Sequence, residues 1–531
     1  MNLIKSTATV GGMTMISRVL GFVRDILIAT FLGTGLVADA WVVAFRFPNL
    51  FRRFFAEGAF NSAFVPLYSK RLEGEGPKAA REFAEEAQAG LGAALIFLSV
   101  LFFVFMPWAM LVLAPGFLFG TGEAFEMATA FARVGAGEVP DKYALTVLFT
   151  RITLPYLFFV SLVALLSGIL NSLGRFLLAA AAPVLLNIIL ISALVFLTPH
   201  VETPGHALVW GVFAAGAAQW LALMWGCKRA GVMPRLRRPR WTPGMKRLVT
   251  LGVPGVIAAG ITQINIVIGT MIATLESGAA SLLYYADRVY QLPLGLIGVA
   301  MGVVLLPDLS RRLRGGDDKG AATSQNRALE FSMLLTIPAA VALAVIPLSI
   351  VIVLFEHGEF VRADAQATAL ALMAFAAGLP AFVAIKVLQP GFFAREDTKT
   401  PMWFAAAQTF VNIALSIILF RQIGFVGIAI ATSVGAWVNT LLLAWRLHAL
   451  GHYQFDARLL SKLPRIVLAA GGMGAGLWFA QIQAISYMDA NLMTQIAALA
   501  ALVIFGLVIY ASLALVTRAA SLSDLRQGLK R

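Results

Sequence analysis

LGAALIFLSVLFFVFMPWAMLVLAPGF, residues 91–117, contains no charged side chain. A helix needs about 20 predominantly apolar residues to cross a bilayer, so this stretch is long enough to span one. Its apolar residues are continuous, whereas those in the strands of a membrane β-barrel alternate with polar ones. The stretch therefore predicts a transmembrane helix, and it sets the fold class for the rest of the chain.

The same character extends over all 531 residues, of which 60% are hydrophobic and 13% charged, with a mean hydropathy of +0.84. Soluble domains carry about a quarter charged residues, and a single core stops growing beyond about 250–300 residues. This composition excludes a cytosolic enzyme, a secreted disulfide scaffold and a disordered chain. The lone cysteine, Cys227, excludes an intramolecular disulfide and a paired-cysteine metal site.

Fourteen stretches are apolar and long enough to cross a membrane as helices. They lie near residues 10–33, 36–68, 86–114, 143–170, 176–198, 206–227, 248–275, 279–309, 328–355, 365–393, 400–420, 424–445, 466–485 and 492–516. We therefore expect an all-α polytopic membrane protein with 14 transmembrane helices.

The positions of the basic residues predict the orientation. With the N-terminus in the cytoplasm, 29 of the 41 Lys and Arg residues fall in cytoplasmic segments and four on the opposite side. Such a bias is what the positive-inside rule requires, and an odd number of spans would destroy it. We expect both termini in the cytoplasm and the loops near 115–141 and 356–364 in the periplasm. The net charge of +14 is then a topology signal and does not indicate binding to nucleic acid.

Spans 1–6 resemble spans 7–12 in the same order. VPLYSKRL at 65–72 ends the second span, and LPDLSRRL at 306–313 ends the eighth. Pro155 precedes Asn187 by 32 residues, and Pro380 precedes Asn412 by the same 32. A repeat of six spans gives two halves of the same orientation, which is a transporter architecture with the substrate site between two lobes.

This repeat predicts the domain organisation. Two parallel six-helix lobes surround a central cationic cavity, and two C-terminal helices lie outside the repeat. The predicted boundaries are 1–230 for the N-terminal lobe, 231–450 for the C-terminal lobe, and 451–531 for helices 13 and 14 with a cytoplasmic tail.

Eight basic residues lie inside predicted spans. An ionisable side chain at the bilayer centre costs about 2.5–3.5 kcal/mol, so these side chains need counter-ions or a hydrated cavity. The acids at comparable depth are Asp25, Asp39, Glu57 and Asp287. The cations outnumber these four acids, and there are eight of them: Arg18, Arg24, Arg46, Arg52, Arg53, Arg151, Arg288 and Lys386.

A surplus of about four positive charges requires an anion from outside the protein. Seven of the eight cations are arginines, whose planar fork suits bidentate recognition of phosphate or carboxylate. A lipid with a diphosphate headgroup fits this pattern best. Pairing within the scaffold is the alternative, because Asp39, Arg46 and Arg53 repeat at intervals of seven and share one helix face.

Other site chemistry is missing from the sequence. It has no phosphate-binding loop of the GxxxxGKS type, no nucleophile–base constellation and no histidine spacing for a metal. We therefore expect a transporter that is not an enzyme, without a cofactor or a metal site.

Four motifs carry a resemblance to a known family. SRVLGFVRD at 17–25, PNLFRRFFAEGAFNSAFVP at 48–66, YYADRVYQLPLG at 284–295 and PGFFAREDTKTP at 390–401 closely resemble the MurJ/MviN family of lipid II flippases. This family belongs to the multidrug/oligosaccharidyl-lipid/polysaccharide exporter superfamily. The resemblance spans the whole chain, including the two C-terminal helices.

The resemblance implies a function in peptidoglycan synthesis, and hence in cell wall biogenesis and cell shape. The chain would move the undecaprenyl-diphosphate-linked precursor from the cytoplasmic to the periplasmic leaflet of the bacterial inner membrane by alternating access. The substrate-binding residues that it implies are Arg18, Arg24, Arg52, Arg53, Arg288, Asp39 and Glu57. Further candidate cavity charges are Asp25, Arg46, Asp287, Arg151 and Lys386.

Two other transporter classes remain open. A flippase for another lipid-linked oligosaccharide would also need arginines. A drug/cation antiporter of the same fold would need buried acids, and the charge surplus here has the opposite sign. The expected partners are lipid II, membrane lipids and a coupling ion or the membrane potential, and we expect a monomer.

Overall fold

The computed structural model describes residues 3–55, 59–119 and 126–520, which form helices and short connections. Within these ranges it does not describe the side chains of 3–8, 51, 53–55, 59, 62, 127, 254–259, 261–262 and 298–304. The chain divides into two compact units, Met1–Ser281 and Leu282–Arg531.

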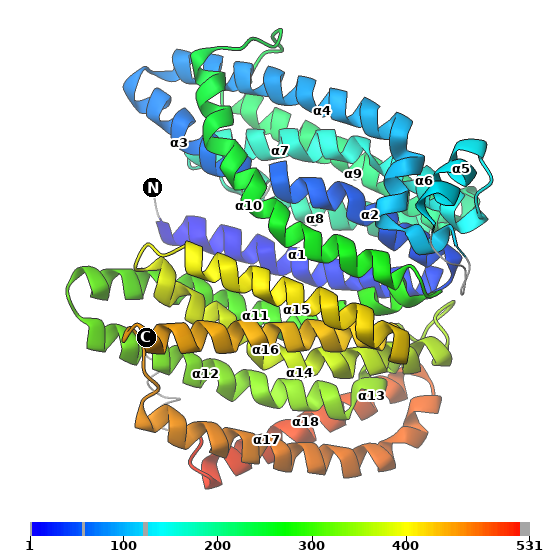
Figure 1. Cartoon of the computed structure of the whole chain (residues 1–531), viewed down its shortest axis with the longest axis vertical. Coiled ribbons are helices and arrows are strands. Elements are labelled where there is room, and N and C mark those ends of the chain that lie inside the picture. The colour runs from blue at the N-terminus through cyan, green and yellow to red at the C-terminus, as the bar shows by residue number, and fades with distance from the viewer. Residues whose placement is uncertain (1–2, 56–58, 120–125, 521–531) are drawn as a thin grey trace. The chain divides into compact units, whose positions relative to one another are not determined.

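The first unit contains the helices drawn from blue to green in Figure 1. Their bounds are α1 (Leu3–Leu32), α2 (Leu36–Phe55), α3 (Ala59–Gly74), α4 (Pro77–Leu113), η1 (Pro115–Phe117), α5 (Met127–Ala136), α6 (Asp141–Thr153), α7 (Pro155–Ser172), α8 (Leu177–Ser192), η2 (Ala193–Leu197), η3 (Thr198–His200), α9 (Pro204–Arg229) and α10 (Pro243–Ala273).

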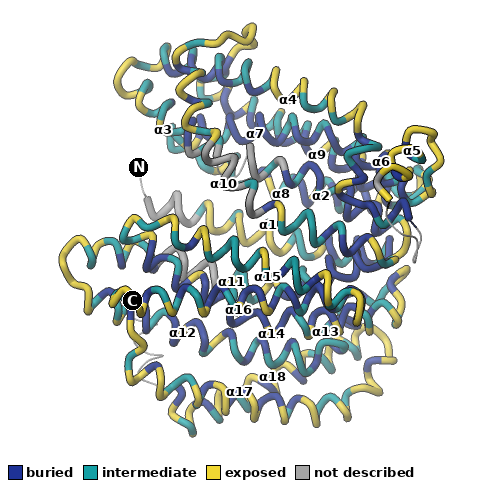
Figure 2. Tube along the Cα trace, viewed as in Figure 1, coloured by how far each residue is buried: buried dark blue, intermediate teal, exposed yellow. Residues whose placement is uncertain are grey.

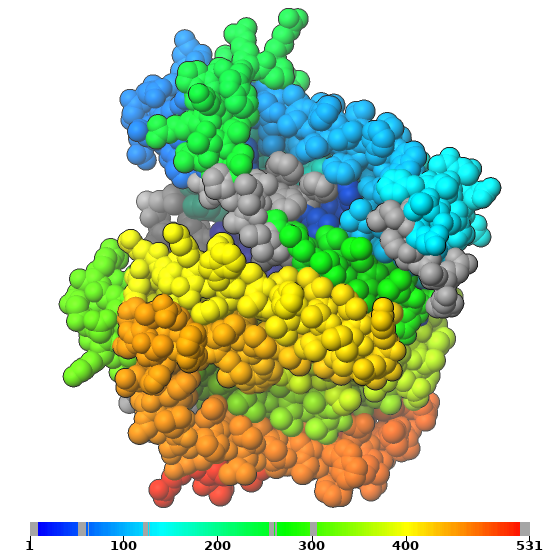
Figure 3. Space-filling model, viewed as in Figure 1, coloured from blue at the N-terminus to red at the C-terminus, as the bar shows by residue number. Residues whose placement is uncertain are grey.

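The second unit contains the helices drawn from green to red, and the first three residues of α11 belong to the first unit. Their bounds are α11 (Ala279–Arg314), α12 (Asp318–Val345), α13 (Pro347–Phe355), α14 (Arg362–Phe393), α15 (Lys399–Ile423), α16 (Val426–Ala449), α17 (Ala457–Ala484), η4 (Ile485–Asp489) and α18 (Leu492–Val516). Yellow and orange atoms of α15–α17 cover the face of this unit shown in Figure 3.

The predicted all-α membrane fold is confirmed. Ten helical segments among the described residues are long and apolar enough to cross a membrane, and part of α10, Gln263–Ala273, is a shorter apolar helix. Each of the fourteen predicted spans coincides with one helix or with two consecutive helices. The short helix α5, Met127–Ala136, lies in a segment that was expected to be a loop.

Polar side chains mark where several helices begin. An N-cap side chain accepts a bond from an N–H of the first turn that has no partner within its own helix. This arrangement occurs at α9, α10, α12, α17 and α18, where the capping residues are Thr203, Thr242, Asp317, Asp456 and Asn491. Apolar length fixes the spans, and these caps fix where the helices start.

Corresponding spans of the repeat form the centre of each unit. In the most apolar 18-residue stretch of the fourth span, α6–α7, 72% of the residues are buried. The same share is buried in the most apolar 18-residue stretch of the tenth span, α14. In contrast, only 22% and 17% of the residues are buried in the most apolar stretches of α4 and α18, as the yellow and teal sections of Figure 2 show. Because the exposed stretches of these two helices are apolar, their outer faces suit contact with lipid.

Helix α10 packs within the first unit. It contacts α2, α3 and α4, and Met245 at its start contacts Gly90 of α4, where a Cβ would lie 2.5 Å from the methionine methyl carbon. The packing unit therefore ends at Ser281, after the seventh predicted span. The boundary at 230 remains a prediction about the sequence repeat.

The connection between α9 and α10 lies along the start of α4. The Glu85 carboxylate is buried and accepts bonds from the backbone N–H of Arg235 (3.0 Å) and from Nε of Arg237 (2.7 Å). Glu86 accepts from the Thr242 hydroxyl at 2.7 Å. Acidic side chains of α4 thus hold a basic connection, which orders its backbone.

Candidate anion-binding site

Arg24 on α1 is held from two sides. Its Nε and Nη2 donate to Oδ1 of Asp25 at 3.0 and 2.7 Å, and its Nη1 donates to Oδ1 of Asn187 on α8 at 2.8 Å. The Arg24 side chain is 12% exposed, and Asp25 is buried. Contacts with two separate acceptors fix the plane of a guanidinium, so Arg24 is oriented before any ligand binds.

Asn187 joins the same contact to the backbone of α1. Its Nδ2 donates to the carbonyl of Ser17 at 2.9 Å, and a Cβ on Gly21 would lie 3.4 Å from this nitrogen. The side chain is buried, so both ends of the amide need these partners. The sequence analysis used Asn187 only as a marker of the repeat. One signal could have identified it, because it is a lone amide in the otherwise apolar helix LLAAAAPVLLNIILIS.

Asp39 on α2 is fully buried and bound to donors from two other segments. Its carboxylate accepts from Nζ of Lys142 on α6 and from the backbone N–H groups of Gly278 (2.8 Å) and Ser281 (3.0 Å). The Ser281 hydroxyl donates to it at 2.8 Å. Asp39 therefore caps the first turn of α11, where the helix dipole also favours a negative charge.

Lys142 was not predicted as a partner of Asp39, because it directly precedes the fourth predicted span, 143–170. Its Nζ also lies 4.3 Å from the centroid of the Phe117 ring. Arg46, predicted to share a stripe with Asp39, instead donates to the Thr270 hydroxyl on α10. Both described contacts, of Asp39 and of Arg46, link α2 to another helix.

The remaining predicted site residues lie in several places. Arg18 is exposed on α1, Arg52 is half-buried on α2, and Arg288 in the second unit lies 4.6 Å from the ring centroid of Tyr284. Arg53 and Glu57 lie outside the described side chains. The described side chains of α1, α2 and α6 include six cations against three acids. The cations are Arg18, Arg24, Arg46, Arg52, Lys142 and Arg151, and the acids are Asp25, Asp39 and Asp141.

The candidate cavity charges have mostly local contacts. Asp287 accepts from the Gln291 amide one turn later, and Nε of Arg151 donates to the Phe103 carbonyl at 3.0 Å. Lys386 is exposed on α14. The three residues stay predictions as cavity charges.

The fourth motif, 390–401, forms the turn between α14 and α15. The backbone N–H of Thr400 donates to Asp397 at 3.0 Å, and the bonds from Thr400 hold the pKa of the Asp397 carboxyl below its usual range. Arg395 Nη1 donates to the Gly391 carbonyl at 2.9 Å. The described contacts of this motif shape the turn.

No group of three or more His, Cys, Asp or Glu side chains among the described residues could hold a metal ion. Near Asn412 on α15 the contacts are neutral, because its Oδ1 accepts from the hydroxyls of Ser416 (3.3 Å) and Thr432 (3.5 Å).

Comparison with known proteins identifies the family of the chain. The family model described as lipid II flippase MurJ matches residues 28–498. The chain belongs to the lipid II flippase MurJ family. A relative from Rhizobium meliloti (strain 1021), named a probable lipid II flippase MurJ, is 45% identical over all of this chain and 97% of its own length. The lipid II flippase MurJ of Burkholderia cenocepacia is 36% identical, covering 88% of each chain.

Solved structures agree on the fold. A MurJ flippase solved in an inward closed conformation superposes with a TM-score of 0.76 at 24% identity, covering 98% of this chain and 99% of that one. An inward-facing multidrug transporter of the MATE family gives 0.64 at 16% identity, covering 82% and 95%. The MurJ fold of this chain is therefore shared with the wider superfamily that the motifs implied.

Proposed function

We propose that the chain is a lipid II flippase, which moves the undecaprenyl-diphosphate-linked peptidoglycan precursor from the cytoplasmic to the periplasmic leaflet. The observation that supports this most is the orientation of Arg24 by Asp25 and Asn187, in a group of helices where cations outnumber acids. Arginine forks bind diphosphate in two parallel hydrogen bonds, so an oriented Arg24 suits that headgroup. Arg18, Arg52 and Arg288 supply further contacts in this proposal.

Alternating access is the mechanism we propose for the translocation. A ligand can shift a protein between two states only if it binds them differently. The diphosphate would do so if its contacts with Arg24 and with Arg288 differ in strength between the two states. A drug/cation antiporter is disfavoured, because Asp39 is bound to Lys142 and to α11 and so does not offer an open carboxylate.

Flipping can be tested directly in cells depleted of their own flippase. Expression of this chain should restore the supply of lipid II on the periplasmic side, measured by its access to an externally added enzyme that cleaves lipid II. If growth is restored while lipid II stays cytoplasmic, the proposed substrate is wrong. Restoration of surface polysaccharide only would support the flippase for another lipid-linked oligosaccharide.

The proposed orientation, in the bacterial inner membrane with both termini in the cytoplasm, gives a second test. A cysteine at Glu138 should react with a membrane-impermeant thiol reagent added to intact cells, and one at Lys319 should not. The native Cys227 is buried and provides an unreactive background. Labelling at Lys319 but not at Glu138 would reverse the predicted orientation.

Asn187 gives a third test, because it orients Arg24 without being charged. Asn187→Leu removes the acceptor, and the loss of one hydrogen bond should weaken lipid II binding about three- to tenfold. Asn187→Asp keeps the acceptor for Arg24 but adds a negative charge beside it and loses the donor to the Ser17 carbonyl, so binding should fall at least as far and the unfolding midpoint should also drop.

The control for Asn187 is its counterpart in the repeat. Asn412→Leu also removes a buried amide, but the described bonds of Asn412 are to hydroxyls, so lipid II binding should be preserved. Equal losses of binding in Asn187→Leu and Asn412→Leu would show that the amides act only on folding. The binding titration and the unfolding midpoint are measured on the same samples.

A further inference from the structure

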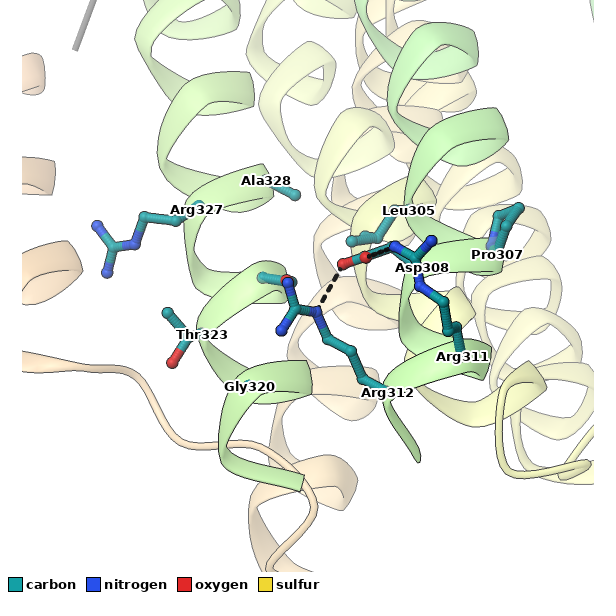
Figure 4. Close-up of a pocket in the computed structure, with 10 residues that line it drawn as sticks. Leu305, Pro307, Asp308, Arg311, Arg312, Gly320, Thr323, Arg327 and Ala328 are labelled. Atoms are coloured by element: carbon teal, nitrogen blue, oxygen red, sulfur yellow. Dashed lines mark hydrogen bonds and ion pairs between the residues drawn. The ribbon is translucent and has the colours of Figure 1, made fainter. Parts of the chain in front are cut away.

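A cavity of about 710 Å³ lies in the second unit between the end of α11 and the start of α12. Figure 4 shows its lining, in which Arg311 and Arg312 of α11 both point toward Asp308. Leu305 and Ala328 contribute apolar surface. None of these residues belongs to the anion-binding site described above.

The repeat explains why this place is hollow. Residues 65–72 and 306–313 are 241 positions apart, and α4 and α12 begin at Pro77 and Asp318, also 241 apart. Residues related by this offset are buried in both units: Phe64 and Leu305, Tyr68 and Leu309, Ala80 and Ala321. The α3–α4 and α11–α12 hairpins therefore share one packing register.

Within this register, the first unit fills the position that the second leaves open. Phe83 is buried, stacks on Phe64 with a centroid distance of 5.6 Å, and lies under the Arg71 guanidinium at 4.3 Å. Its counterpart is Ser324, which lines the cavity, and the counterpart of Phe64 is the smaller Leu305. Replacing two rings by a hydroxyl and an isobutyl group removes the volume that would close the space.

At the same positions one acid is replaced by a neutral residue and one by a basic residue. In the first unit Glu82 and Glu86 contact the basic α9–α10 connection, through Arg237 (3.8 Å) and Thr242 (2.7 Å). Their counterparts at offset 241 are Thr323 and Arg327, which both line the cavity. Acids hold a basic segment in one unit, so the equivalent place in the other is suited to an anion.

The guanidiniums in the cavity are oriented and still have donors to offer. Nη2 of Arg311 lies 2.7 Å from Asp308, and Nε of Arg312 lies 3.0 Å from it. Nη1 of Arg312 also donates to Oδ2 of Asp317 at 3.2 Å. A guanidinium has five N–H donors, so these two carboxylates use only part of the two forks. The side chains of Arg311 and Arg312 are 78% and 38% exposed, which leaves them accessible. Arg327 turns toward Glu330 and Asp456 and borders the cavity.

We propose that this cavity binds the phosphate of an anionic phospholipid. Basic pockets between transmembrane helices on the cytoplasmic side are suited to lipid headgroups, and the predicted orientation puts the end of α11 on that side. The apolar part of the lining suits the glycerol and upper acyl region of a lipid. A free phosphate ion shares the same chemistry but would not need this apolar surface.

A fluorophore at the rim provides a local test. Lys319 is exposed one turn before Thr323, and a cysteine there can be labelled selectively because Cys227 is buried. The full-length labelled protein in detergent is titrated with water-soluble short-chain phosphatidylglycerol, with the matching phosphatidylcholine, and with inorganic phosphate. We expect a saturable response to phosphatidylglycerol and a response at least tenfold weaker to the other two.

Variants connect the response to the cavity. Arg311→Gln combined with Arg312→Gln should weaken phosphatidylglycerol binding about tenfold or more, because two charge-assisted contacts are lost. Ser324→Phe restores the ring found in the first unit and should have a similar effect without changing charge. Arg314→Gln is the matched control, since Arg314 is on the same helix end, bonds to the Ser310 carbonyl and does not line the cavity.

Three results would overturn the proposal: equal binding of phosphatidylcholine, an unchanged response in both the Ser324→Phe and the double glutamine variant, or a response to inorganic phosphate without one to phosphatidylglycerol. If Ser324→Phe does not fold, as judged by its unfolding transition, the double glutamine variant decides the outcome.

Discussion

Replacing Arg24 by alanine is expected to lower lipid II binding about ten- to a hundredfold and to stop flipping at matched expression, since charge-assisted bonds contribute about 1.5–3 kcal/mol each. Arg24→Lys should restore little binding or flipping, because a single ammonium group cannot contact Asp25, Asn187 and a diphosphate in the geometry of a planar fork. Binding is measured by titration with lipid II in detergent, and flipping in proteoliposomes.

The control for this prediction is Arg421→Ala, which removes an exposed arginine at the end of α15. It should leave both measurements unchanged. The double variant Arg24→Ala with Arg288→Ala should bind no better than either single variant. Binding at the level of the unmodified protein in this double variant would refute the proposed diphosphate contact.

The second large effect is expected at Asp39. Asp39→Asn leaves the Lys142 ammonium without its counter-charge in a nearly buried position and weakens the cap of α11. Breaking one side of a buried ion pair costs about 3–5 kcal/mol, so a marked drop in the unfolding midpoint is expected together with loss of transport.

A double-mutant cycle separates the pair from the cap. Lys142→Met alone should also destabilise, and Asp39→Asn with Lys142→Met should be more stable than the sum of the single effects predicts. Glu202→Gln is the control, because the Glu202 side chain is 88% exposed and its change should alter stability by less than about 0.5 kcal/mol. Additive effects of the two changes would show that Lys142 and Asp39 are not coupled.

The membrane spans could be predicted because their signal is local. Twenty continuous apolar residues suffice to identify a spanning helix, and the caps and connections do not alter that assignment. The starts of α4 and α12 were predicted about ten residues late, because charged residues such as Arg81 and Glu85 interrupt the apolar pattern although the helix continues. The helix α5 was missed because ten residues of mixed polarity resemble a loop.

The candidate site was predictable in composition but not in pairing. The surplus of arginines is visible in the sequence, whereas the partner of each charge depends on which helices pack together. Arg24 contacts its own neighbour Asp25, although adjacent residues on a helix point about 100° apart. Lys142 reaches Asp39 across 103 positions of sequence, and helical periodicity says nothing about such a contact.

The packing of α10 has a consequence for synthesis. Since the first unit includes this seventh span and ends at Ser281, it can be complete only after 281 residues have been made. At a translation rate of about 5–20 residues per second, that takes on the order of 15–55 s. Between the end of α4 at Leu113 and the end of α10 at Ala273, the surfaces of α2, α3 and α4 that α10 later covers would face the insertion machinery or lipid. An insertion chaperone that binds those surfaces would have to leave when α10 arrives, so release of the nascent chain and completion of the first unit would be one event.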